Sequence, residues 1–542
     1  MAETSSSLRL FKHRPFLVYW LAGFSANFGW QIQLVGASWL MTSLGGTPEL
    51  VAMVQTVVAL PVMLLSLPGG ALSDLIGQRT LTLWAQSFLL VVSALLALGA
   101  FFGLLTPTLL LICTFLIGSG RALYYPGWQA TVFEFVPKSE VTAAVALNSS
   151  NLNIARSLGP AIGGVIVAAA GAFVAFVVNA LSNLSVIFVA SRWPKARPSQ
   201  DLPPEPLGRA IMAGLRYVTL SPVLIKLGLR SVVFNISAIA VLAMLPLIAR
   251  DQLDSGAGTF GVLLAAFGVG AVAGSLYIDR LRRLIPLEKF LAFGFLCFAS
   301  GTAILGVSTW TALSIFGALI AGAAWSFVQV TLYSIVQISS PRWVLSRTIA
   351  IYQIFVFGGN AIGSLIWGDL AGNSGTEFTM LVAAGIMAAG ALLGTVFRIN
   401  EVDGSRVDIS GSWVAPKPAL DMAMKSGPVL TTITYRIREI DAPVFVDAMR
   451  EKRRNRIRDG AMRWTLSRDI LDPELWYERF KVATWADAQR LHARRTTEST
   501  ELIEFIRGLH QGDQAPEVHY ELVRDPGVSL NIRDATVTSN VP

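Results

Sequence analysis

Three basic side chains lie inside strongly apolar segments of this sequence, where an ionisable group is costly and usually serves a function. They are Arg121, Arg156 and Arg230. Arg121 is followed by Tyr125 and Trp128, at a helical spacing that puts all three on about the same face. A guanidinium beside aromatic rings favours a flat anionic or aromatic ligand, held by charge and cation–π contacts. The alternatives are that Arg121 pairs with an acid such as Glu134 or snorkels to the membrane surface.

Polar side chains on the same segments extend this candidate substrate cavity. Besides the three arginines, we expect it to be lined by Asn27, Gln31, Gln129 and Asn153. Asn27 and Gln31 are four residues apart on one helix face, where they either line a cavity or bond a neighbouring helix. The apolar segments hold scarcely any central Asp or Glu and no His. This favours an anionic substrate and leaves the proton-carrying group unidentified.

The stretch around Arg156 returns 200 positions further along the chain, which predicts two related halves. Its repeated positions are Gln129 with Gln329, Gly159 with Gly359, and Gly163 with Gly363. Small residues four apart share one helix face and let a neighbouring helix approach closely. We therefore assign to helix packing the residues Gly159, Pro160, Gly163 and Gly164. Because Val356 stands in place of Arg156, the halves are not equivalent, and the first carries most of the polar chemistry.

The composition indicates a protein that crosses a membrane many times. Of the 542 residues, 53% are hydrophobic and only 14% are charged, unlike a soluble domain. We expect an all-α polytopic membrane protein with about twelve transmembrane helices in two six-helix halves. Their expected centres are Phe28, Leu60, Val92, Phe115, Ile154, Leu181, Phe234, Phe267, Leu296, Ile320, Ile354 and Met387. The net charge of +8 comes from Lys and Arg gathered in alternate loops, which excludes a nucleic-acid interpretation and predicts two cytoplasmic termini.

Shifts in composition divide the chain into seven parts. They are a cytoplasmic tail (1–15), the first six-helix half (16–191), a Pro-rich central cytoplasmic loop (192–221), the second half (222–397), a linker (398–427), a small cytoplasmic domain (428–525) and a flexible tail (526–542). In the small domain, alternating patterns predict strand, helix, strand, strand, helices and strand, an α+β order that suggests a ferredoxin-like sandwich. The basic run from Arg450 to Arg458 is expected to be a solvated helix face, or to touch anionic lipid.

A recognisable signature follows the second expected helix, in Gly70-Ala-Leu-Ser-Asp74-Leu-Ile-Gly77-Gln-Arg79. It resembles the loop motif G-x-L-x-D-x-x-G-x-R of the major facilitator superfamily. Gly70 permits close helix approach, and Gly77 permits a tight turn. Asp74 is suited to act as a charge latch toward a basic group or a helix end, and in this family the latch holds one conformation of the transporter. The resemblance thus assigns Gly70, Asp74, Gly77 and Arg79 to gating.

Two further resemblances refine this assignment. The Gly159 to Gly164 element is similar to the fifth-span motif of superfamily exporters that work as antiporters, which implies efflux. The last domain, with Trp485 and His492 after a strand ending near Thr484, resembles the antibiotic-biosynthesis-monooxygenase family of dimeric α+β barrels. Because fold does not carry function, a structural or sensing role is favoured for it over catalysis. Taken whole, the chain resembles the enterobactin-exporter-like branch, the transmembrane secretion effectors.

The function that these resemblances imply is secondary active transport. A small anionic or amphipathic molecule, siderophore-like or drug-like, would be exported by alternating access, with proton antiport as the driving force. The alternatives are an importer of organic acids or sugars on the same scaffold, or a membrane-anchored enzyme or sensor acting through the last domain. No cofactor, metal ligand or catalytic residue is predicted, and the oligomeric state stays open. The expected location is the bacterial inner membrane, with the bilayer, the substrate and protons as partners.

Overall fold

The structure is a computed structural model of the 542-residue chain. It describes residues 8–131, 135–136, 140–192, 207–341, 343–399, 418–420, 422–512 and 514–523. Residues 193–206 of the expected central loop, most of the linker and all of the final tail lie outside these residues. The chain forms two compact units. The first comprises residues 1–196, 226–334 and 350–401, and the second comprises residues 197–225, 335–349 and 402–542.

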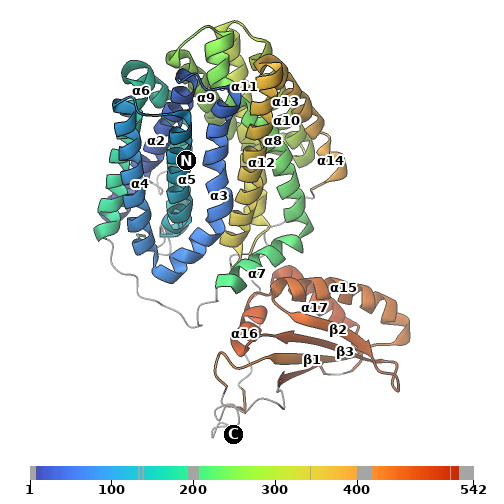
Figure 1. Cartoon of the computed structure of the whole chain (residues 1–542). Coiled ribbons are helices and arrows are strands. Elements are labelled where there is room, and N and C mark those ends of the chain that lie inside the picture. Colours follow the sequence, from blue (N-terminus) through green and yellow to red (C-terminus); the bar gives the residue numbers. More distant parts are fainter. Residues whose placement is uncertain are drawn as a thin grey trace. The chain divides into compact units, whose positions relative to one another are not determined.

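The first half of the chain consists of long helices that run along one bundle (Figure 1). After a 3-10 turn at Leu8–Lys12, they are α2 (Arg14–Ser43), α3 (Pro48–Ile76), α4 (Gln78–Phe101), α5 (Pro107–Ala130) and α6 (Val141–Arg192). Proline opens α3 and α5, where its missing N–H has no helical partner to lose. Gly77 separates α3 from α4 with a φ of +85°, and Gly171 breaks α6 with a φ of +77°, backbone angles that favour glycine.

The second half repeats this plan. Its helices are α8 (Pro222–Leu247), continued by a π-turn at Ile248–Gln252, then α9 (Ala257–Leu284), α10 (Leu287–Val307), α11 (Thr311–Ile338), α12 (Leu345–Ser374), α13 (Thr376–Gly390) and the short α14 (Leu393–Val396). Within the described residues, ten helices are long and apolar enough to cross a membrane. The segment 154–192 of α6 counts once among them, although it contains the break at Gly171, and α2 is not among them.

The glycine repeat occupies matching positions in the two halves. A Cβ on Gly159 would lie 2.6 Å from Cβ of Gln31 on α2, and Gly163 packs on the backbone of the same helix at Ile32. In the second half, Gly359 and Gly363 of α12 pack in the same way on α8, against the backbone at Val232 and Ile236. Helix α12 therefore meets α8 as α6 meets α2.

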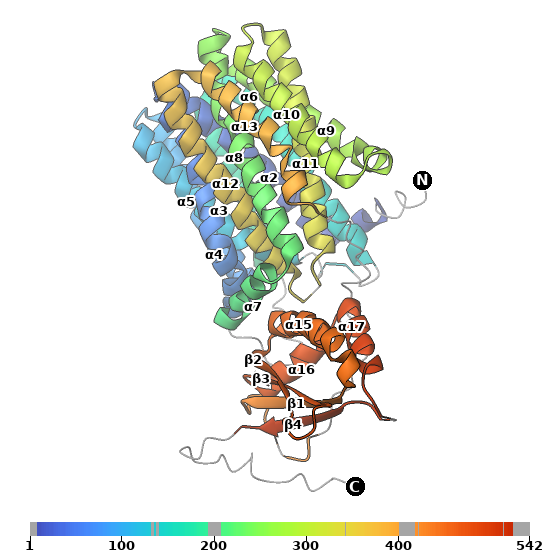
Figure 2. The same ribbon diagram turned by 90° about the vertical axis from the view of Figure 1, so that its right-hand side faces the viewer.

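The second unit contains a four-stranded antiparallel sheet in the order β2-β3-β1-β4. Its elements are β1 (Val429–Arg436), α15 (Ala442–Asp459), β2 (Met462–Arg468), β3 (Leu475–Val482), α16 (Trp485–Ala493), α17 (Thr497–Gly508) and β4 (Glu517–Leu522). The helices cover one face of the sheet (Figure 2). This order of elements is the one that the alternating sequence patterns predict.

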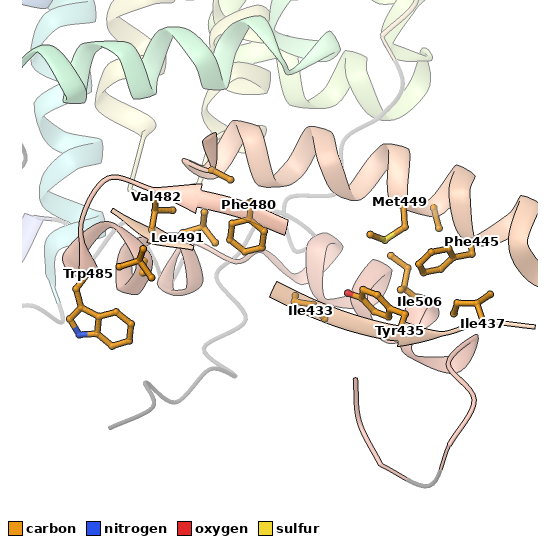
Figure 3. Close-up of a cluster of buried hydrophobic side chains, with 14 residues drawn as sticks. Ile433, Tyr435, Ile437, Phe445, Met449, Phe480, Val482, Trp485, Leu491 and Ile506 are labelled. Atoms are coloured by element: carbon orange, nitrogen blue, oxygen red, sulfur yellow. The ribbon is translucent and has the colours of Figure 1, made fainter. Parts of the chain in front are cut away.

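An apolar core joins the sheet to these helices (Figure 3). Phe445 and Met449 of α15 point toward Tyr435 of β1, while Trp485 and Leu491 of α16 gather near the end of β3. Phe445 is fully buried, and its ring centroid is 5.4 Å from that of Tyr435. The interdigitated aromatic and aliphatic side chains give this domain a core of its own.

The basic run on α15 differs from the solvated face that the sequence predicts. Arg450 is exposed, but Lys452 and Arg456 are buried at 3% and 7% exposure. Both face Glu478, whose carboxylate is fully buried in the middle of β3. Its Oε2 lies 2.9 Å from Nζ of Lys452, and its Oε1 accepts a hydrogen bond from Nε1 of Trp464 at 3.0 Å. The expectation is wrong here because a carboxylate on the neighbouring strand compensates cations that the helix turns inward.

Helix α7 (Leu207–Thr219) and the connection from α11 to α12 belong to this second unit. Tyr217 of α7 is buried and donates a hydrogen bond to the carbonyl of Ser339 at 3.4 Å. Its ring centroid lies 5.7 Å from that of Trp343, over which the guanidinium of Arg494 sits at 4.0 Å. At the other end of α7, Arg209 pairs with Asp487 of α16 at 3.0 Å. The small domain is thus held to α7 and to the α11–α12 connection.

Candidate functional site

Arg121 on α5 lies beside two aromatic rings. Its guanidinium carbon is 5.0 Å from the ring centroid of Trp30 and 4.8 Å from that of Tyr125, within cation–π distance of both. Its Nη2 donates a hydrogen bond to Oδ1 of Asn27 at 2.8 Å. In the part of the chain that the structure describes, Asn27 is the one hydrogen-bond acceptor of Arg121. A guanidinium has five N–H donors, so this arrangement orients Arg121 and leaves donors for an anionic group.

Asn27 is itself held by a network that joins three helices. Its Nδ2 donates to Oδ1 of Asn151 on α6 at 3.1 Å, and Nδ2 of Asn151 donates to the carbonyl of Trp20 at 2.8 Å. Both amides are buried, at 7% exposure for Asn27 and 0% for Asn151. Because each amide has a fixed partner, Asn27 presents its oxygen to Arg121 in one orientation. Of the two roles left open for Asn27, the structure shows an interhelical bond that also positions the arginine.

Arg156 belongs to the same group. It lies in the membrane-spanning part of α6, yet its side chain is exposed. Arg121 and Tyr125 act on it electrostatically, and so does Tyr333 from α11 of the second half. Arg156 therefore lies within electrostatic range of Arg121 and of side chains from both halves. The structure therefore brings Arg121 and Arg156 together.

Arg230 does not join them, which corrects the expectation for this residue. It is 4% exposed and makes a two-pronged ion pair with Glu288 of α10, with contacts of 2.5 Å and 3.2 Å. Oε1 of Glu288 also accepts a hydrogen bond from the backbone N–H of Ile399 at 2.6 Å. This pair satisfies the charge of Arg230 locally, where it ties α8 to α10 and to the end of the bundle.

The remaining predicted residues are placed as follows. Gln31 is half-buried where α2 meets Gly159, and Gln129 is exposed near the end of α5. The side chain of Asn153 and residue Glu134 lie outside the described part. Trp128 does not line up with Arg121, because it is buried and its ring stacks on Tyr19 at 4.5 Å.

Of the gating motif, the structure describes Gly77 and Arg79. The surroundings of Gly70 and the side chain of Asp74 lie outside the described part. Gly77 makes the left-handed turn described above. The guanidinium of Arg79 donates hydrogen bonds to the carbonyls of Ala190 and Ser191, at 3.1 Å and 2.8 Å. These carbonyls end α6, where the helix has unpaired acceptors and a negative dipole end. Arg79 thus fastens the start of α4 to the last turn of α6.

Contacts between the two halves gather at the end of the bundle where α6 breaks, which we call the Gly171 end. The contacting pairs are Thr42 with Arg250, Trp39 with Phe260, Glu49 with Gly372, Ala52 with Gly368, Thr56 with Ser364, and Gly164 with Gly261. At Gly164 the contact is between two backbones, since a Cβ there would lie 2.2 Å from Cα of Gly261 on α9. Glycine is required here because the two backbones touch.

Two residues of this site were missed by the sequence reasoning. Trp30 lies three positions after Asn27 on α2, and Tyr333 lies four positions after Gln329 on α11. Both spacings put the aromatic ring on the face of a recognised amide, so helical periodicity was the available signal. This spacing alone is not specific, because aromatic side chains in apolar helices usually pack against lipid or neighbouring helices.

Known proteins share this architecture. The family described as transmembrane secretion effector matches residues 5–526. A multidrug efflux pump, Tap, from Mycolicibacterium fortuitum is 21% identical over 404 residues, which cover 72% of this chain and 98% of Tap. A staphyloferrin A transporter from Staphylococcus aureus is 24% identical over 52% of this chain and 72% of its own length.

A solved structure shows the same fold in the bundle. The nucleoside transporter NupG superposes with a TM-score of 0.55 at 10% identity, over 71% of this chain and all of NupG. At this identity the likeness concerns the fold alone. The family match, in contrast, spans both the bundle and the small domain. This chain therefore belongs to the transmembrane secretion effector family, and it is a membrane transporter of the major facilitator superfamily, not an enzyme.

Proposed function

We propose that this transporter exports a small anionic or amphipathic molecule by alternating access, with protons moving in the opposite direction. The observation that carries the proposal is the arrangement of Arg121, between Asn27 and two aromatic rings, with Arg156 facing the same space. Two arginines beside aromatic rings suit a ligand that combines an oxyanion with a flat apolar group. The names of the two relatives, one for multidrug efflux and one for staphyloferrin A transport, support drug-like or siderophore-like cargo.

The bundle supports twelve spans. The ten apolar helices, α2, and a division of α6 at Gly171 give this number. The basic loops mark the Arg79 end as cytoplasmic, so both termini and the small domain face the cytoplasm of a bacterial inner membrane. The Gly171 end is then the outer end. Since the contacts between the halves gather there, the conformation is the one in which the arginines open toward the cytoplasm.

The alternating-access step follows from these contacts. Loading from the cytoplasm requires the Gly171 end to stay closed around Gly164 and Gly261. Release outside requires α6 to part from α9, and α3 to part from α12, while the Arg79 end closes. The glycine contacts are shallow and apolar, so separating them costs little compared with breaking ion pairs. The cavity arginines would then face the outer solution, where the gradient of protons favours release.

For the small domain we propose a ferredoxin-like sandwich related to the antibiotic-biosynthesis-monooxygenase family, with a structural or sensing role. The order of its elements and the strand order β2-β3-β1-β4 support the fold. His492 is poorly suited to proton chemistry, because burial, together with the charges of Arg456 and Arg495, lowers its pKa to about 2. A histidine that stays neutral across the physiological range is neither an acid catalyst nor a pH switch.

The test is transport in inside-out vesicles that contain the purified chain. A proton gradient is imposed, and uptake of catecholate siderophores and of cationic dyes is measured side by side. We expect proton-dependent uptake of the anions, abolished by Arg156→Ala and kept by Arg192→Ala, a matched loss of charge at the exposed end of the same helix. Uptake of the cations alone, or wild-type uptake by Arg156→Ala, would contradict the proposal. Uptake only when the gradient is reversed would indicate an importer.

A further inference from the structure

A second hollow lies between α9 and α11, apart from the arginine site. It encloses about 390 Å³, within the range of pockets that hold small molecules, roughly 300–1,000 Å³. Its lining is largely apolar and includes a single guanidinium. The lining residues are Ala273, Gly274, Tyr277, Arg280, Leu281, Leu284, Ala323 and Phe327.

The two helices that line this hollow are closely packed. Gly274 of α9 sits on the backbone of α11, since a Cβ there would lie 2.6 Å from the carbonyl oxygen of Ala323. Phe327 is buried in a cluster with Ile278 and Phe290, and its ring centroid is 5.5 Å from that of Phe290. The hollow is therefore a fixed feature of two packed helices.

The hollow straddles the level at which α9 changes from apolar to charged. Ala273 and Tyr277 lie in its apolar stretch, whereas Arg280, Arg282 and Arg283 follow near its end. Tyr277 is 56% exposed and Leu284 is 75% exposed, large values for apolar side chains with no role in the core. A tyrosine followed by basic residues at the end of a span is the usual arrangement at the level of lipid headgroups.

The charge at this level is positive. Arg282 and Arg283 follow Arg280 in the last turn of α9, so three guanidiniums meet the membrane boundary. Among the described side chains, none forms an ion pair with Arg280. An anionic group held by Arg280 would have its apolar continuation directed along the hollow, between Tyr277 and Phe327. Anionic headgroup and apolar tail are the two parts of one phospholipid.

We propose that this hollow is a binding site for an anionic phospholipid of the cytoplasmic leaflet, with its phosphodiester on Arg280 and one acyl chain between α9 and α11. The leaflet assignment rests on the orientation proposed above, whereas the binding itself does not depend on transport. The guanidinium of Arg280 offers bidentate contacts that suit a phosphodiester.

The experiment measures lipid binding to the full-length chain. Purified protein is exchanged into mixed micelles or nanodiscs that hold phosphatidylglycerol and phosphatidylcholine, and bound lipid is counted by native mass spectrometry. We expect one phosphatidylglycerol to be retained in preference to phosphatidylcholine. Arg280→Ala should weaken its retention about fivefold, the loss expected for one basic contact to an anionic headgroup. Arg283→Ala removes the same charge from the same turn without touching the lining, so it should retain the lipid.

Two further measurements distinguish a specific lipid site from non-specific electrostatic attraction of anionic lipid. Ala273→Phe should fill the hollow at an exposed position and lower retention while Arg280 stays in place. Glycerol phosphate in excess, which has the headgroup chemistry without the chain, should not displace the lipid. Equal losses for Arg280→Ala and Arg283→Ala would overturn the proposal, as would no preference for phosphatidylglycerol. Displacement by glycerol phosphate would replace the lipid with a soluble phosphate ligand and would overturn it too.

Discussion

Arg121 and Asn27 are joined by a hydrogen bond of 2.8 Å that links the fourth long helix of the first half, α5, to the first, α2. The second half has a bond of the same length between α11 and α8, where Nε2 of Gln329 donates to Oδ1 of Asn235. In the 200-residue repeat, Gln329 corresponds to Gln129, and Ala321 takes the position of Arg121. The second half therefore has no charge at this position, so the positive potential around Arg121 is not imposed by the fold.

Replacing Arg121 with glutamine keeps an N–H donor and removes the charge. We expect Arg121→Gln to insert and fold normally, because the bond to Asn27 can be kept. Its KM for anionic cargo should rise by about 10- to 100-fold, the loss for a hydrogen bond to a charged group, about 1.5–3 kcal/mol. Competition of labelled anions with unlabelled cargo in vesicles measures this change.

The control for Arg121→Gln is Arg121→Lys. Lysine keeps the charge but lacks the planar donors, so it should recover part of the affinity for anions. Equal KM values for the wild type and Arg121→Gln would show that the arginine serves helix packing. A rise that Arg121→Lys does not reverse at all would point to the guanidinium shape and away from its charge.

Much of the bundle is predictable from the sequence because its signals are local. Runs of apolar residues fix the helices, and the glycine repeat identifies how α6 and α12 pack. The partners of charged residues are not predictable in this way. Arg121 and Arg230 look alike in the sequence, yet one lies beside aromatic rings and the other pairs with Glu288, 58 positions away. Only tertiary packing decides which arginine is neutralised.

The ion pair of Arg230 with Glu288 yields a stability prediction. Removing one partner leaves a buried charge uncompensated, so Arg230→Leu or Glu288→Gln should each destabilise the protein by roughly 3–5 kcal/mol. The double variant Arg230→Leu, Glu288→Leu should recover most of this loss, since an apolar pair of similar volume needs no compensation. Thermal unfolding in detergent measures the three variants. If the double variant is as unstable as the single ones, the pair is not a self-contained structural unit.

The pair of Glu478 with Lys452 predicts an acid transition in the small domain. Burial raises the pKa of Glu478, but the charges of Lys452 and Arg456 outweigh it and lower the pKa from 4.5 to about 2. A carboxyl with a depressed folded pKa stabilises the fold above its unfolded pKa, and the contribution is lost as pH falls from about 4.5 toward 2. The contribution is about 3 kcal/mol at neutral pH, from 1.36 kcal/mol for each pKa unit.

Hydrogen exchange of the β3 amides in the full chain measures this loss. Protection should fall between pH 4.5 and 2, and Glu478→Gln should lower it already at neutral pH and flatten its dependence on acid. Glu474→Gln is the matched control, because that carboxylate is exposed in the loop before β3. Equal pH profiles for the wild type and Glu478→Gln would show that protonation of this buried carboxylate does not cause the loss of protection in acid.

The inward turn of α15 shows why the sequence misleads in this region. A run of Lys and Arg on a helix normally faces water, and Arg450 and Arg454 do. Lys452 and Arg456 each lie two residues further on, on the opposite side of the helix, and face Glu478 because β3 places a carboxylate at the centre of the sheet. In β3, Glu478 is the one charge on the face that also carries Trp476 and Phe480, and nothing in either segment alone shows that it pairs with α15.

The contact of Gly164 with Gly261 predicts how the Gly171 end closes. A side chain on Gly164 would overlap the backbone of α9, so Gly164→Leu should hold α6 and α9 apart. In the proposed cycle the halves close there to load cargo from the other end, so we expect transport to fall at least tenfold while the protein stays in the membrane. Gly258→Leu is the matched control, since a Cβ at that position of α9 meets nothing within 4 Å.

A cross-linking experiment tests the closure itself. Cysteines that replace Trp39 and Phe260, whose rings lie 5.9 Å apart across the same contact, should cross-link readily in the wild-type background and in Gly258→Leu but not in Gly164→Leu. Normal transport by Gly164→Leu with its cross-link lost would show that the closure is not required for the cycle.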